Sequence, residues 1–250
     1  MKDTHIALSI FIPVFNEEGI FRQNAERLIE FVNALSIPYE IVICSNGSTD
    51  RTVELGCALE NAYPEKIRFF AINEKGVGRA LKFCIPHFKY SYILSLDMDL
   101  SSDLSFIKEV LTHLTDYDII IGSKKVGSQN RKFIRKLGSG LYIFLTKLLL
   151  GIKYTDYSLG SKVYRKDIIE RYVEWINDYG TDYVINIVYN AFQDGHRIIE
   201  IPVKCFDNRA SKFNLVGEGI YRFRKIFALR FKHKGKACHN KSILPYNMGC

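Results

Sequence analysis

No apolar run in this sequence is long enough to cross a membrane. The longest, LYIFLTKLLLGI at residues 141–152, contains Lys147 and is well short of the roughly 20 residues that a spanning helix needs. Residues 1–18 move directly into a strand-like pattern and do not resemble a secretory signal. We therefore expect a cytoplasmic protein without a spanning segment, which can still lie on a membrane surface.

Cysteine is sparse and scattered. None of the six cysteines forms a CxxC pair, the spacing typical of zinc sites and redox motifs. Several lie in apolar runs, where a reduced, buried thiol is the usual state. These features favour a reducing compartment over a disulfide scaffold.

Negative charge is in deficit. The chain has 35 Lys and Arg against 27 Asp and Glu, and its formal net charge is +8. The basic residues concentrate in 124–136 and 209–241. Such a balance favours an acidic partner: nucleic acid, a phosphorylated small molecule or an anionic membrane. No zinc finger, arginine-rich repeat or aromatic RNA-binding pattern accompanies these residues, so we expect no nucleic-acid partner.

Short apolar runs alternate with amphipathic helical patterns through the first half. Strands are predicted at 7–14, 39–45, 66–72, 92–96 and 117–123, and helices at 17–35, 48–62, 77–89 and after Asp103. Ser48 or Thr49 can cap the second helix. Alternation of this kind predicts an α/β fold with a mostly parallel sheet and helices on both faces.

The alternation of strand and helix patterns is less regular in the second half of the sequence. Residues 131–150 are basic and then apolar, 167–175 and 181–194 have helical patterns, and 196–206 is strand-like. Polar residues gather after four of the predicted strands, at 13–17, 45–50, 97–103 and 122–124. Because ligands of parallel sheets bind at the carboxyl ends of the strands, we expect one shared site there.

The segment SYILSLDMDLSSD, residues 91–103, ends a strand with three aspartates. Clustered carboxylates repel one another, so they need either a compensating charge or an exposed position. Asp97 and Asp99 stand at i and i+2 on the loop that leaves the strand. Hard oxygen ligands of this kind suit Mg²⁺ or Mn²⁺, and we favour a metal site over solvated surface carboxylates.

Six segments resemble, in order, the motifs of family 2 inverting glycosyltransferases with a GT-A fold: SIFIPVFNEEG, EIVICSNGSTDRT, NEKGVGRAL, LSLDMDLSSD, IIIGSKKV and IIEIPVKCFDNRASKF. Within that family they look most like the polyprenyl-phosphate (dolichol-phosphate) sugar synthases. The resemblance covers residues 6–225.

The resemblance implies a nucleotide-sugar site in the first half. The residues that match the turn lining the base and ribose are Pro13, Phe15, Asn16 and Glu17. Asp97 and Asp99 match the metal-binding carboxylates, and Ser101 stands where the family often has a glutamine that also reaches the metal. An ordinary strand-to-helix turn would explain Glu17 alone.

The second motif departs from the family. Ser45-Asn46-Gly47-Ser48 stands where DDGS or DDNS is usual, and one or both of those aspartates commonly bind the base. The Asn46 amide can both donate and accept, so base binding is expected with an altered preference.

Several charged residues match family positions around the leaving diphosphate and the acceptor. Lys124 and Arg135 are expected to bind the nucleotide sugar, and Arg209 and Lys212 to be catalytic, with solvated surface charge as the alternative. Asp182 resembles the acidic residue that opens the helix facing the acceptor. It is either a general base or a first-turn carboxylate favoured by the helix dipole.

The resemblance implies that the chain moves a hexose, with inversion, from a nucleotide diphosphate sugar to a polyprenyl or dolichyl phosphate on the cytosolic face of a membrane. GDP-mannose is the favoured donor and UDP-glucose the next. The alternatives are transfer to a sugar hydroxyl in polysaccharide or glycan assembly, and a nucleotide-sugar-binding subunit without turnover.

The domain organisation follows from the same resemblance. We expect one GT-A catalytic domain over 1–230, with a nucleotide-sugar half at 1–124 and an acceptor half at 125–230. Residues 231–250 are expected to form a basic, mobile tail. Residues 131–150 either lie on the membrane or pack as core, and a membrane-anchoring partner subunit is possible.

Overall fold

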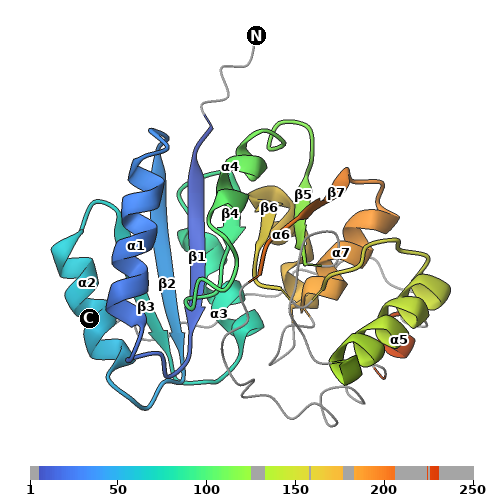
Figure 1. Ribbon diagram of the computed structural model, residues 1–250, viewed down its shortest axis with the longest axis horizontal. Helices are drawn as coiled ribbons and strands as arrows, with labels where there is room; N and C mark the ends of the chain where they lie inside the picture. The colour runs from blue at the N-terminus through green and yellow to red at the C-terminus, as the bar shows by residue number, and fades with distance from the viewer. Residues whose placement is uncertain are drawn as a thin grey trace.

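The computed structural model describes residues 6–124, 133–157, 159–176, 183–205, 224 and 226–230, without the side chains of 133–139 and Trp175. These residues form an α/β fold around a seven-stranded sheet (Figure 1). The strands are β1 (Leu8–Val14), β2 (Tyr39–Asn46), β3 (Ile67–Ile72), β4 (Tyr92–Ser95), β5 (Ile119–Ser123), β6 (Lys162–Arg165) and β7 (Ile198–Pro202). The helices are α1 (Phe21–Asn33), α2 (Thr52–Ala62), α3 (Val77–Cys84), α4 (Ser105–Leu111), α5 (Phe133–Leu150), α6 (Lys166–Tyr172) and α7 (Tyr183–Gln193), with short 3-10 helices at Ile85–His87 and Val173–Trp175.

The sheet is mostly parallel, as expected. Its strand order is β3-β2-β1-β4-β6-β5-β7, and β6 alone among these seven strands runs antiparallel to its neighbours. The central strands β1 and β2 are buried along nearly their whole length. Such continuous apolar runs form buried strands because helices cover both faces.

Two apolar cores lie on the two faces of the sheet. Along β1 the side chains of Leu8, Ile10 and Ile12 enter one core, and the ring of Phe11 enters the other. The first core includes α1, α2 and α4, and the second includes α3, α6, α7 and the end of α5. Figure 1 shows α1 and α2 toward the β3 end of the sheet and α5 at the opposite end. The alternation of side chains along a strand therefore divides the core as the pattern predicts.

Two helix starts differ from the sequence expectation. The first helix begins at Phe21 rather than at 17, because Asn16 adopts a left-handed backbone (φ 53°) and the following residues form a turn. Ser48 and Thr49 do not cap α2. Their hydroxyls contact Asn16 instead, and α2 begins at Thr52, whose N–H donates to Asp50 Oδ1 at 3.0 Å.

The second half contains a strand that the sequence pattern does not predict. β6 has four residues, two of them charged, and it inserts between β4 and β5. The predicted helix at 167–175 is present as α6 and the following 3-10 helix, and β7 occupies the centre of the predicted strand at 196–206.

The cysteine expectation holds in part. Cys44 and Cys84 are buried free thiols, whereas Cys57 is disulfide-bonded. The expectation of a reduced thiol is therefore wrong for Cys57.

In the part of the chain that the structure describes, no helix combines the length and apolar character needed to span a bilayer. The predicted tail at 231–250 lies outside the described residues.

Candidate active site

The ends of β1 and β2 are joined by hydrogen bonds between their loops. The Asn16 backbone N–H donates to Ser48 Oγ at 3.1 Å, and the Thr49 N–H donates to Asn16 Oδ1 at 2.7 Å. The Glu17 N–H donates to Thr52 Oγ1 at 2.9 Å. Asparagine tolerates the left-handed conformation better than most residues, which explains its place at this turn.

Asn46 is buried and bound to the protein on both sides of its amide. Its Nδ2 donates to Val14 O at 2.8 Å, and its Oδ1 accepts from the Gly76 N–H at 3.1 Å. Ser45 Oγ donates to Ser48 Oγ at 2.9 Å. The departure from DDGS therefore replaces carboxylates with groups that tie this turn to β1 and to the start of α3.

Phe15 and Lys75 face each other next to this turn. The Lys75 ammonium lies 3.8 Å from the centroid of the Phe15 ring, which is a cation–π contact. Pro13 lies opposite Cys44 on β2, beyond Phe11, which makes the last pair of β1 with β4. A strand position without a second neighbour tolerates the missing N–H of proline.

The loop after β4 carries the two aspartates that the sequence singles out. The Ser101 N–H donates to Asp99 Oδ1 at 3.0 Å, and the Leu100 N–H donates to Asp97 O at 3.1 Å. From α1, Asn24 Nδ2 donates to Met98 O at 3.0 Å. Hydrogen bonds within the loop and from the Asn24 side chain therefore fix the backbone that carries the two carboxylates.

Asp103, the third aspartate of this segment, has a different role. Its Oδ1 accepts from the Ser105 N–H at 2.8 Å, at the start of α4. This hydrogen bond lowers the pKa of the Asp103 carboxyl. Asp103 therefore holds the first residue of α4, at the helix end where the dipole favours a carboxylate.

Asp97 lies in an environment of opposing charges. Burial, followed by the nearby charge of Asp99, raises the pKa of the Asp97 carboxyl. The Gly160 N–H, which donates to Asp97 Oδ2 at 3.1 Å, opposes this shift, as do the ammonium groups of Lys162 and Lys124. Mutual repulsion between two carboxylates and their partial burial are features of sites that bind cations.

Three residues at this site are missing from the sequence prediction: Asp156, Gly160 and Lys162. Lys124, at the end of β5, is buried and pairs with Asp156, with 3.5 Å between Lys124 Nζ and Asp156 Oδ2. Lys162 on β6 is fully buried, and burial lowers the pKa of its ammonium to about 8. The one signal in the sequence is the polar segment TDYSLGSK within a region without clear periodicity.

The predicted residues are brought together in part. Pro13, Phe15, Asn16 and Asn46 meet around one turn, while Asp97, Asp99 and Lys124 follow β4 and β5 on the same sheet. Arg135 lies on α5, and its side chain is not described. The predicted catalytic residues Asp182, Arg209 and Lys212 lie outside the described residues.

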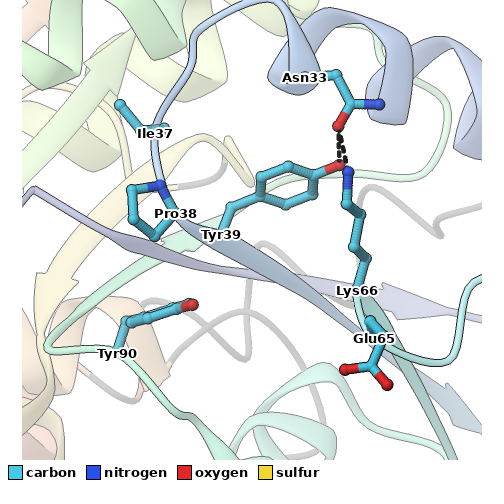
Figure 2. A pocket seen from close by; sticks show the side chains of 7 residues that line it. All are labelled: Asn33, Ile37, Pro38, Tyr39, Glu65, Lys66 and Tyr90. Atoms are coloured by element: carbon cyan, nitrogen blue, oxygen red, sulfur yellow. Dashed lines mark hydrogen bonds between the residues drawn. The ribbon is translucent and has the colours of Figure 1, made fainter.

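A pocket of about 360 Å³ lies elsewhere, next to the start of β2 (Figure 2). Tyr39 OH and Lys66 Nζ both donate to Asn33 Oδ1 there, at 2.7 and 2.6 Å. The parallel strands begin at this end of the sheet, whereas Asp97 follows the end of β4. The pocket therefore does not belong to the candidate site.

The donor set at Asp97 and Asp99 fits Mg²⁺ or Mn²⁺. No group of three or more His, Cys, Asp and Glu side chains that could hold a metal occurs among the described residues. Two carboxylates without a closed protein cage suit a cation that keeps waters and shares its shell with substrate phosphates.

The chain belongs to glycosyl transferase family 2, whose model matches residues 9–173. It is similar to the dolichyl-phosphate beta-glucosyltransferase of Dictyostelium discoideum, at 26% identity over 92% of this chain and 75% of that protein. It is also similar to the undecaprenyl-phosphate 4-deoxy-4-formamido-L-arabinose transferase of Edwardsiella ictaluri, at 25% identity over 90% of this chain and 66% of that protein. Across four curated relatives, the chain spans 35% to 75% of their lengths.

Among solved structures, the chain is similar to glucosyl-3-phosphoglycerate synthase of Mycobacterium tuberculosis in complex with Mn²⁺, UDP and phosphoglyceric acid. The TM-score is 0.65 at 14% identity, over 90% of this chain and 78% of that one. This likeness establishes the fold, which is the expected GT-A fold.

Proposed function

We propose that this chain transfers a hexose from a nucleotide diphosphate sugar to a polyprenyl phosphate, with inversion. The observation that carries the proposal is the pair Asp97 and Asp99 at the end of β4, held by the N–H groups of Gly160 and Ser101. The turn that joins Asn16 to Ser48 stands at the corresponding ends of β1 and β2. Ligands of parallel sheets bind at this edge.

Asp97 and Asp99, with Ser101 beside them, would hold the metal ion. The described charged groups around Asp97 and its neighbour Lys162 comprise four carboxylates (Asp97, Asp99, Asp156 and Glu200) and two ammonium groups (Lys124 and Lys162). Four minus two leaves two negative charges, which one divalent cation would balance. When bound, such a cation stabilises negative charge on the leaving diphosphate.

The nucleotide lies, in this proposal, against the Phe15 and Asn16 turn. Because Asn46 is bound to Val14 and Gly76, it shapes this turn, and its part in base recognition is indirect. The sequence resemblance favours GDP-mannose. The relatives named for a glucosyltransferase and for a UDP complex support UDP-glucose, which we place first.

Lys124, Arg135, Arg209 and Lys212 neutralise the diphosphate and the acceptor phosphate in this proposal. Guanidinium and ammonium groups bind phosphate oxygens through charged hydrogen bonds. A phosphate oxyanion is already ionised, so its oxygen attacks the anomeric carbon without a strong general base. In this proposal Asp182 is therefore not required as a general base.

The outer face of α5 supports a lipid acceptor. Leu141, Phe144 and Leu148 stand at helical spacing and are 52%, 61% and 67% exposed, while Ile143 on the opposite side is buried. Two further apolar residues of α5, Leu145 and Leu149, are half-buried. An exposed apolar stripe on a helix that does not combine the length and apolar character needed to span a bilayer is typical of interfacial helices.

Basic side chains accompany this stripe. Lys147 is exposed on the same face, and Arg224 and Arg230 are exposed near the 226–230 helix, which presents Phe227 at 47% exposure. Ile226 and Leu229 of that helix enter the same core as the end of α5. We propose that this surface (Leu141, Phe144, Lys147, Leu148 and Phe227) binds the cytosolic face of an anionic membrane.

One assay separates the proposed reaction from its alternatives. The chain is incubated with UDP-glucose or GDP-mannose and Mn²⁺, with polyprenyl phosphate, with sugar acceptors or with water alone. Formation of a polyprenyl-phosphate sugar is the expected result. Transfer to sugar hydroxyls alone would favour glycan assembly, and nucleotide binding without turnover would favour a non-catalytic subunit.

A further inference from the structure

One turn next to the Asp97 carboxylate contains none of the predicted site residues. We call it the Gly160 turn, residues 155–157 and 159–162. It lies between α5 and β6, and it is tied to β5 by the Gly122 N–H, which donates to Ser161 O at 2.9 Å. Its polar groups point to Asp97 at one end and to β7 at the other.

The turn is closed by its own side chains. The Leu159 N–H donates to Asp156 Oδ1 at 3.1 Å, and Lys162 Nζ donates to Leu159 O. Asp156 and Lys162 are both buried. Bonds of this kind over three residues fix the backbone direction, which aims the Gly160 N–H at Asp97 Oδ2.

Glu200 of β7 anchors the start of the turn. Its Oε1 accepts three hydrogen bonds: from the Thr155 N–H at 2.9 Å, the Thr155 hydroxyl at 2.7 Å and the Asp156 N–H at 2.9 Å. A single carboxylate oxygen therefore connects β7 to the segment that reaches Asp97.

Gly160 has no room for a side chain. A Cβ at this position would lie 2.4 to 2.5 Å from the Asp97 carboxylate atoms, and no other atoms come as near to it. Gly160 does not have the left-handed φ that would itself demand glycine. The space is needed because the carboxylate rests directly against the backbone.

We infer that Gly160 and Glu200 are positioning residues for Asp97: the Gly160 turn, anchored by Glu200, sets where the Asp97 carboxylate stands and so how well it binds a divalent cation. The inference rests on the proposed function. Partners behind a metal ligand commonly change metal affinity about 10- to 100-fold when they are lost.

The test measures binding of Mn²⁺ alone to the full chain, by the electron paramagnetic resonance signal of the free ion. Gly160→Ala moves the Asp97 carboxylate and is expected to weaken Mn²⁺ binding at least about tenfold, with an unchanged melting temperature in the absence of metal. Gly19→Ala is the control, because a Cβ there meets no atom within 4 Å. Wild-type affinity in a folded Gly160→Ala chain would overturn the inference and leave the proposed function standing.

A second pair of variants decides the matter if Gly160→Ala fails to fold. Glu200→Gln keeps an oxygen that can accept the three bonds, so near wild-type Mn²⁺ affinity is expected. Glu200→Ala loses that oxygen, and about a tenfold weaker affinity is expected. Equal affinity in both variants and the wild type would overturn the inference. A wild-type chain that binds no Mn²⁺ overturns the metal dependence in the proposed function, and the inference with it.

Discussion

Burial of the charged Lys162 side chain has a clear cost in desolvation free energy. Its side chain is 1% exposed, and burial lowers the pKa of its ammonium from 10.5 to about 8, against the attraction of Asp156. Buried charges persist where partners compensate them. Here the neighbouring carboxylates Asp156, Asp97 and Glu200 provide that compensation.

This pKa predicts how stability depends on pH. The Lys162 ammonium has a pKa of about 8 in the folded state and of 10.5 in the unfolded state. Between these two pH values the unfolded state binds more protons than the folded state. The free energy of unfolding therefore rises with pH in this range. The Lys162→Met variant has no titrating group at this position and therefore lacks this pH dependence. From about pH 7.5 to about pH 9.5, the free energy of unfolding of the wild type should gain about 2 kcal/mol relative to Lys162→Met. Urea denaturation at both pH values measures the difference, and a constant difference would contradict the assigned pKa.

Arg209 and Lys212 lie outside the described residues, and their role stays a prediction. If each makes a charged hydrogen bond to phosphate, Arg209→Ala and Lys212→Ala should each lower kcat/KM by the equivalent of about 1.5–3 kcal/mol. Lys153→Ala, which removes an exposed lysine of the described region, is the control. Unchanged kinetics in both test variants would identify these residues as solvated surface charge.

At the scale of elements, α2 packs on β3 through a glycine. A Cβ at Gly56 would lie 2.1 to 2.4 Å from ring atoms of Phe69, which is buried and contacts Phe21. Gly56→Ala should therefore destabilise the fold by about 1–3 kcal/mol through overpacking, although alanine favours helices. Gly140→Ala on α5 meets open space and should be neutral or slightly stabilising. Thermal unfolding compares the two, and equal melting temperatures would contradict the close packing of α2 on β3.

Much of the first half could be predicted from the sequence because its signals are local. The buried runs at β1, β2 and β5 and the amphipathic helices between them follow from periodicity alone. The pair Asp97 and Asp99 follows the apolar run of β4, which is why the sequence singles it out. The part of Asn46 in base binding stays a prediction, and its amide also joins two loops.

The remaining parts of the fold and of the candidate site depend on contacts between residues that are distant in the sequence. β6 becomes a strand because β4 and β5 offer it partners on both sides, and nothing in its four residues indicates this. Gly160 meets Asp97 across 63 positions of sequence, and Glu200 meets Thr155 across 45. Such contacts leave no periodic signal, so the Gly160 turn could not be predicted from the pattern.

At the scale of the whole molecule, the proposed membrane surface on α5 is expected to set how the protein lies on a bilayer. Figure 1 shows α5 at the end of the sheet remote from α1 and α2. Phe144→Ser plus Leu148→Ser should reduce salt-sensitive flotation with anionic liposomes and leave the melting temperature nearly unchanged, because both side chains are exposed. Tyr63→Ser, which changes an exposed aromatic residue after α2, is the matched control. Wild-type flotation by the double variant would contradict a membrane role for this surface.

The central claim is sugar transfer to a lipid phosphate at the Asp97 and Asp99 site. The most direct measurement is formation of polyprenyl-phosphate sugar by the wild type, Asp99→Ala and Asp103→Ala, each with Mn²⁺ and with EDTA. Asp103 is a matched carboxylate that accepts a hydrogen bond at the start of α4, so Asp103→Ala should keep activity and lose about 1 kcal/mol of stability. The account predicts product from the wild type and Asp103→Ala with Mn²⁺, and none from Asp99→Ala or in EDTA. Normal turnover by Asp99→Ala in EDTA would contradict it.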